Sequence, residues 1–117
     1  MTRHQGFDVR VAPEVLATLA RSPKRPASTE RTKGFARAMR RLRREGTRAE
    51  GVKKLKGLDL WEIRFESHRA FFRLVPRTRT IAVGFVQTKK SWRIPMRRLR
   101  HIERVVRGWS DELEAGR

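Results

Sequence analysis

The sequence predicts an α+β fold in which two N-terminal helices precede a mainly antiparallel sheet of three or four strands and a basic helix follows it. Two observations predict this. Three successive runs within residues 60–86 alternate apolar and polar side chains, the period of half-buried strands. Residues 30–45 and 95–107 instead repeat apolar residues every three or four positions, which is the period of a helix. At 117 residues the chain fits a single domain, since one core usually serves ~100–200 residues.

The N-terminal part is expected to contain a strand and a short helix. Residues 1–11 include alternating apolar and polar positions and form a possible edge strand. Pro13 suits the first turn of a helix because its φ is already helical. Residues 22–29 carry two prolines and small polar side chains, which indicates a loop.

A second helix is predicted from about Glu30 to Glu45. Phe35, Met39 and Leu42 recur at helical spacing, and Gly46 is a natural stop. Its other side is rich in arginine, namely Arg37, Arg40, Arg41, Arg43 and Arg44. Such a run is either a solvated helix face or a surface that contacts RNA.

The three strand-like runs place cations on one face of the sheet. In the first run Trp61, Ile63 and Phe65 alternate with polar residues, and the short connections make the strands antiparallel neighbours. Parity then puts Arg64, Arg69 and Arg73 on the face that helices do not wholly cover. The same parity puts Glu62, Glu66 and Phe71 on the arginine side, and groups Ile81, Val83 and Phe85 on one side of the third strand.

The last helix is expected to begin at Pro95 and to reach Arg107 or slightly beyond. Leu99, Ile102 and Val106 form its apolar stripe, and arginines surround the rest. Residues 111–117 are expected to be a frayed tail.

Charge and composition narrow the function. Thirty Lys and Arg against 12 Asp and Glu give a formal net charge of +18, which indicates a polyanionic partner. Nucleic acid is the first candidate, an acidic protein the second, and an anionic membrane surface the third. The chain has no cysteine and three scattered histidines, so we expect neither disulfides nor a metal or other cofactor. No apolar run could span a bilayer and no signal segment is recognisable, so we expect a cytoplasmic protein without membrane attachment.

Several short motifs occur together in a known order. The runs VKKLKG, LWEIRF and HRAFFRLV are followed by a strand ending in GFV, a lysine pair and a proline that opens a basic helix. In this order the sequence resembles the RelE/ParE toxin superfamily, and within it the phage Gp49-like HigB branch, over about Phe35–Val106. The resemblance implies a RelE-like fold. It also implies a type II toxin that inhibits translation as a metal-independent, ribosome-dependent endoribonuclease, or mRNA interferase, neutralised by a helix-turn-helix antitoxin.

The resemblance also implies which residues act on RNA. RNA cleavage without metal uses the ribose 2′-OH as nucleophile and needs cations to hold the developing phosphorane, a task that suits arginine and lysine. The catalytic candidates are Arg64, Arg69, Lys89, Lys90 and His68. The RNA-binding candidates are Lys53, Lys54, Lys56, Arg73, Trp92, Arg93 and Arg97, of which Arg73 rests on strand parity rather than on a motif.

The general base stays open because the chain departs from the family pattern. It contains no tyrosine, and His68 stands where members commonly have one. Histidine has a reference pKa near neutral pH, so His68 is a candidate base or acid. The alternative is that His68 is only an exposed residue of a hairpin turn. Glu62 and Glu66 are either bases or cross-strand ion-pair partners of the arginines. Trp92 and Phe71 either stack on bases or are covered by a helix or a partner.

Two other functions remain at this stage. A ParE-like inhibitor of DNA gyrase would share the fold without RNA chemistry, and a non-catalytic basic RNA-binding protein would suit the charge and the missing tyrosine. The lysine pair and the VKKLKG loop favour the nuclease.

Overall fold

The computed structural model describes residues 6–21, 26–87 and 93–116, with residues 26–29 described by their backbone alone. Its helices are α1 (Pro13–Ala20), α2 (Pro26–Glu45) and α3 (Met96–Glu114), with short 3-10 turns η1 (Gly46–Arg48) and η2 (Pro76–Thr78). Its strands are β1 (Asp8–Val11), β2 (Val52–Lys54), β3 (Trp61–Phe65), β4 (His68–Val75) and β5 (Thr80–Gln87). The predicted α+β class is confirmed.

The strands form one sheet in the order β1-β5-β4-β3-β2. The pairs from β2 to β5 are antiparallel, whereas β1 lies parallel to β5. The sheet thus has five strands where we predicted three or four. The strand that we did not predict is β2, whose three residues are too few for alternation to be recognised. The edge strand expected within residues 1–11 is present as β1.

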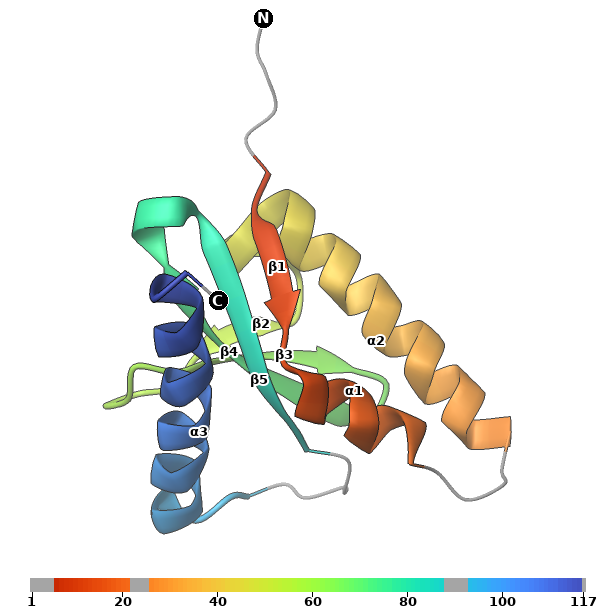
Figure 1. The fold of residues 1–117 in the computed structure, drawn as a ribbon. Coiled ribbons are helices and arrows are strands. Elements are labelled where there is room, and N and C mark those ends of the chain that lie inside the picture. The colour runs from red at the N-terminus through yellow and green to blue at the C-terminus, as the bar shows by residue number, and fades with distance from the viewer. Residues whose placement is uncertain (1–5, 22–25, 88–92, 117) are drawn as a thin grey trace, which may run out of the picture.

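Helices cover both faces of the sheet (Figure 1), with α1 and α2 on one face and α3 on the other. The larger core lies under α1 and α2. There the predicted stripe of Phe35, Met39 and Leu42 is buried against strand residues that include Ile63 and Phe72. The amphipathic pattern of α2 therefore determines which side of this helix meets the sheet.

The second core lies under α3. Ile102 and Val106 are buried there with Leu60 and Phe71, each of them 0% exposed. Phe71 is thus covered by a helix and is no base-stacking platform.

A bulge in β5 lets α3 approach the sheet. Phe71 pairs with Phe85 but Phe72 pairs with Val83, which leaves Gly84 unpaired between them. A Cβ on Gly84 would lie 3.0 Å from the Cα of Val106, closer than is usual for a Cβ contact, so glycine favours this close approach of the helix. The bulge also corrects one prediction: it moves Phe85 to the α3 side, whereas Val83 stays in the α1/α2 core.

Two helices are longer than predicted. Helix α2 begins at Pro26 rather than near Glu30, and α3 continues to Glu114, within the segment expected to fray. Ser110 is fully buried and Asp111 pairs with Arg73 at 3.8 Å, so tertiary contacts hold this last part of α3. Among the described helices, none has the length and apolar character needed to cross a membrane.

Candidate nucleic-acid interface

Strand register brings five polar side chains to one face of the sheet. Arg64 of β3 lies directly opposite Arg69 of β4, and Arg69 lies opposite Gln87 of β5. On the other side, Glu62 lies opposite Lys53 of β2. Directly opposite residues, and residues two apart on one strand, share a face. We call the set Lys53, Glu62, Arg64, Arg69 and Gln87 the arginine face.

The centre of the arginine face is a buried carboxylate between two guanidinium groups. Glu62 is 2% exposed. Its Oε1 lies 3.6 Å from Nη1 of Arg69, and its Oε2 lies 3.9 Å from Nε of Arg64. The Arg64 side chain is 57% exposed and that of Arg69 is 16% exposed, so Arg64 is the more accessible cation.

Three contacts define how helix α3 runs along the sheet. Its later residue Ser110 contacts Arg73, its middle residue Val106 lies over Gly84, and its early residue Arg98 lies 5.9 Å from the ring centre of Phe85. Along β5 the helix therefore runs with its N-terminal end toward Gln87. The arginine face lies toward the same end of β5, because Arg69 is opposite Gln87.

Arg73 shares the face by parity but has a structural role. Its Nε donates to Asp59 at 2.6 Å and its Nη1 donates to the hydroxyl of Ser110 at 2.7 Å. A further ion pair joins it to Asp111. Arg73 thus ties the strand to α3 and to the loop before β3, and we no longer include it in the RNA-binding set.

The three lysines predicted around the VKKLKG loop separate in the structure. Lys53 is exposed on the arginine face. Lys54 lies opposite Trp61, on the other side of the sheet, and its Nζ donates to the carbonyl oxygen of Leu58 at 2.8 Å. Lys56 is exposed in the turn that follows β2. The register therefore unites only Lys53 with the two arginines.

His68 and Glu66 do not join the arginine face, which corrects the predicted grouping. His68 pairs with Phe65, and their rings lie 5.5 Å apart on the α2 side of the sheet. Glu66 occupies the turn between β3 and β4 with φ of 54°, where strand parity no longer applies. Its carboxylate accepts a hydrogen bond from Arg37 of α2 at 3.0 Å.

The remaining predicted residues lie near the end of β5 or beyond it. Lys89, Lys90 and Trp92 are outside the described residues. Arg93 and Arg97 are exposed. Arg98, which we had not singled out, lies over Phe85 at the border of the arginine face. Helical spacing placed Arg98 on a basic helix, but only the docking of α3 shows which of its arginines reaches this border.

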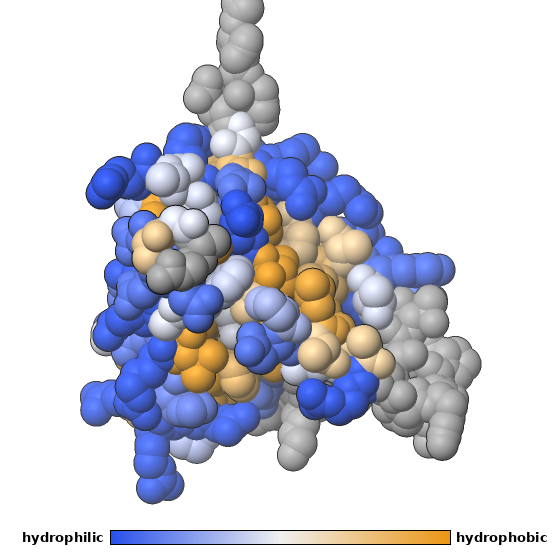
Figure 2. All heavy atoms as spheres, in the orientation of Figure 1, coloured by the Kyte–Doolittle hydropathy of each residue, from blue (hydrophilic) through white to orange (hydrophobic). Residues whose placement is uncertain are grey.

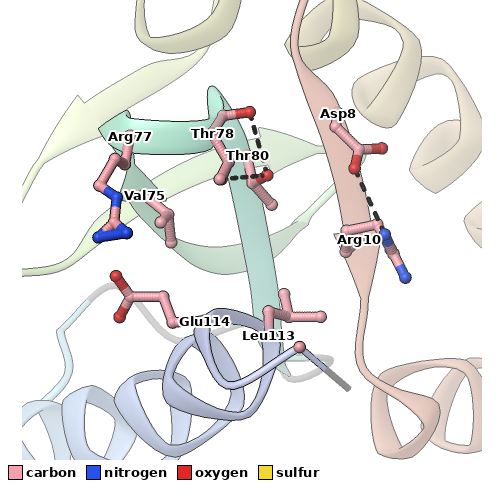
Figure 3. Close-up of a pocket in the computed structure, with 9 residues that line it drawn as sticks. Asp8, Arg10, Val75, Arg77, Thr78, Thr80, Leu113 and Glu114 are labelled. Carbon is pink, nitrogen blue, oxygen red and sulfur yellow. Dashed lines mark hydrogen bonds and ion pairs between the residues drawn. The ribbon is translucent and has the colours of Figure 1, made fainter.

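Other hollows in the structure have different chemistry. Figure 2 shows apolar residues gathered between α1 and α2, where a groove is lined by Leu16, Leu19, Phe35, Ala36, Met39, Arg40 and Arg43. A second hollow, between the β4–β5 turn and the end of α3, mixes acidic Asp8 and Glu114 with Arg10 and Arg77 (Figure 3). Neither contains a residue of the arginine face. Within the described ranges no cluster of histidine and carboxylate side chains could hold a metal ion.

The arginine face is suited to bind an anion. Two guanidinium groups from neighbouring strands and one lysine share this face, and the Arg64 side chain is 57% exposed. Guanidinium groups bind phosphate oxygens through paired N–H donors.

Comparison with solved structures defines the fold class as RelE-like. A chain of the toxin–antitoxin complex RelBE2 from Mycobacterium tuberculosis matches with a TM-score of 0.55 and 21% sequence identity, covering 73% of this chain and 100% of that chain. A chain of the archaeal RelE-RelB complex from Pyrococcus horikoshii OT3 covers 76% of this chain and 100% of that chain, with a TM-score of 0.48 and 17% identity. No protein-family model matches the sequence, and neither does any curated protein. The predicted RelE-like fold is therefore confirmed.

Proposed function

We propose that this protein is a type II toxin of the RelE/HigB kind, a metal-independent endoribonuclease that cleaves mRNA on the ribosome and so stops translation. The observation that carries the proposal is the pair Arg64 and Arg69, placed directly opposite each other in the sheet of a RelE-like fold, with the Arg64 side chain 57% exposed. The lysine pair and the VKKLKG loop support the HigB branch.

The arginine face would supply the electrostatic part of the reaction. The 2′-OH of a ribose gives its proton to a base and attacks its own 3′-phosphate, which forms a phosphorane with extra negative charge. The bond to the 5′-oxygen then breaks, and this oxygen takes up a proton and leaves as the 5′-hydroxyl. Arg64 and Arg69 would bind the non-bridging oxygens and stabilise this charge more than that of the starting phosphate. Lys53 would bind a neighbouring phosphate and hold the strand in register. Lys89 and Lys90 stay candidates for proton transfer to the leaving oxygen.

The proposal includes an antitoxin partner. One solved structure of similar fold comes from a toxin–antitoxin complex, and a protein with a net charge of +18 would otherwise bind RNA indiscriminately. We place the contact at the apolar groove between α1 and α2. Leu16 is 53% exposed there, and Arg40 and Arg43 lie at its edge. A helix-turn-helix antitoxin with apolar and acidic side chains on one helix would fit both features.

Induced expression followed by primer extension on a reporter mRNA tests the function. We expect growth to stop and transcripts to be cut, with 2′,3′-cyclic or 3′-phosphate ends upstream of each cut and 5′-hydroxyl ends downstream. The matched control is Arg64→Ala, which removes one exposed cation from the arginine face.

Other outcomes would lead to the alternative functions. Intact transcripts together with supercoiling defects would identify a ParE-like inhibitor of DNA gyrase. Intact transcripts with normal growth would favour the third function, that of a non-catalytic basic RNA-binding protein. Cuts that appear only in translated regions would establish that the ribosome takes part.

A further inference from the structure

Glu62 is a buried charge, and one of its carboxylate oxygens has no hydrogen-bond partner in the described part of the chain. The residue is 2% exposed, and the oxygen without a partner is Oε1. Burying a carboxylate costs several kcal/mol unless hydrogen bonds and opposite charges compensate. Its two ion pairs, at 3.6 and 3.9 Å, are longer than hydrogen bonds. Stability alone therefore explains this residue poorly.

The ion pair of Arg73 with Asp59 is an example of a structural ion pair in the same sheet. Arg73 binds Asp59 at 2.6 Å and Ser110 at 2.7 Å, with directional hydrogen bonds that join separate elements. Among the described residues, the ion pairs of Glu62 are with Arg64 and Arg69 of its own hairpin, and they are longer. The two carboxylates therefore interact with their arginines in different ways.

The position of Glu62 explains what it could do. Arg64 and Arg69 are directly opposite, and like charges in this relation repel each other. Glu62 lies two residues from Arg64 on the same strand and reaches Arg69 diagonally. Its negative charge offsets that repulsion and draws both guanidinium groups toward the same point of the arginine face.

We propose that Glu62 is a positioning residue, which holds Arg64 and Arg69 together as one phosphate-binding pair. This inference rests on the proposed nuclease function. Glu62 attracts the guanidinium groups by charge at 3.6 and 3.9 Å, not through close hydrogen bonds. Both groups are therefore drawn toward Glu62, and the N–H donors of Arg64 stay available to a phosphate. Glu62 itself transfers no proton in this scheme.

The variant Glu62→Gln tests the proposal, because it keeps the size of the side chain and removes its charge. The matched control is Glu66→Gln, which changes the net charge equally and breaks the ion pair with Arg37, but lies in the β3–β4 turn. Cleavage rates and KM are measured on RNA, with ribosomes where these are required. Affinity is measured with an RNA that carries a 2′-deoxy sugar at the cleavage site and cannot react.

We expect Glu62→Gln to lower kcat about 10- to 100-fold, since displacing a reacting group by about 1 Å costs roughly that much. Binding of the uncleavable RNA should stay equal or become tighter, because one negative charge has gone. Glu66→Gln should leave kcat within about twofold. Equal kcat losses in the two variants, or a loss of kcat that only follows a loss of folded protein, would overturn the proposal.

A second readout does not depend on cleavage. NMR signals of the arginine Nε–Hε groups report whether a guanidinium is held, and we expect the Arg69 signal to move and broaden in Glu62→Gln but not in Glu66→Gln. An unchanged Arg69 signal would overturn the positioning role. If the wild type cleaves no RNA, the nuclease proposal is lost by that result, and the NMR comparison still decides whether Glu62 positions the pair.

Discussion

At the scale of single residues, the arginines of one sheet face have different roles. Arg73 is bound to Asp59 and Ser110 beneath the later part of α3. Arg64 is 57% exposed and has one long ion pair. The alternation of β3 and β4 puts both on the same face, and the position of α3 alone makes one structural and leaves the other available to a ligand.

This difference predicts opposite effects of two alanine substitutions. Arg64→Ala should lower cleavage about 30- to 1,000-fold, the equivalent of roughly 2–4 kcal/mol of transition-state stabilisation, with little change in thermal stability. Arg73→Ala should lower stability by about 1–3 kcal/mol, because it leaves the buried Ser110 hydroxyl without its donor. Cleavage per folded molecule should then stay near the wild-type rate. Denaturation curves and single-turnover kinetics measure the two effects, and a reversed pattern would contradict our assignment.

At the scale of elements, the packing of α3 against β5 determines where along the sheet the helix lies. Gly84 lies at the bulge and faces Val106 of the helix. A methyl group at this point would require a shift of a few tenths of an ångström between α3 and β5. The same helix carries Arg98 over Phe85, at the border of the arginine face.

We predict that Gly84→Ala destabilises the protein by about 1–3 kcal/mol, the usual cost of overpacking. The new Cβ would meet the Cα of Val106 at 3.0 Å, and backbone cannot move aside as a flexible side chain can. Gly108→Ala is the matched control, since a Cβ there meets nothing within 4 Å. In the helix interior this change should stabilise by up to about 1 kcal/mol. Urea unfolding of both variants tests the prediction, and equal midpoints would contradict the proposed fit.

At the scale of the whole molecule, the protein has both a strongly positive charge and an exposed apolar groove. The chain has a net charge of +18, and exposed arginines lie on α2 and α3. Between α1 and α2 the same surface exposes Leu16 in an apolar groove. A partner that covers this region needs both carboxylates and apolar side chains, which an acidic amphipathic helix supplies.

We predict that the product of an adjacent small reading frame binds this protein and restores growth when the two are expressed together. Association should slow as salt rises, because complementary charge speeds the encounter. Leu16→Asp should weaken the complex about tenfold or more through lost apolar contact and added repulsion. Val105→Asp, which changes an apolar residue 37% exposed on α3, should weaken it less. Growth rescue and association rates at low and high salt measure these effects. Equal losses in both variants would show that the groove is not the contact.

The sequence by itself determined the class of the fold and the faces of β3 and β4. Alternation in Trp61–Phe65 has a period of two because a strand points successive side chains to opposite sides. That local rule correctly put Arg64 and Arg69 together. It failed wherever the backbone left the regular strand. Glu66 lies in a turn, and Phe85 follows the bulge at Gly84.

Only the tertiary structure decided which arginines of the sheet face contact α3, and that Glu62 is buried between Arg64 and Arg69. The apolar stripe of Ile102 and Val106 indicates that one side of α3 is buried. The stripe alone does not determine where along the sheet the helix lies. Close approach at Gly84 and the bonds of Arg73 to Asp59 and Ser110 select one of them. These contacts join segments far apart in the chain. Local patterns are set by neighbouring residues and so can be read in sequence, whereas the docking of a helix depends on packing between distant ones.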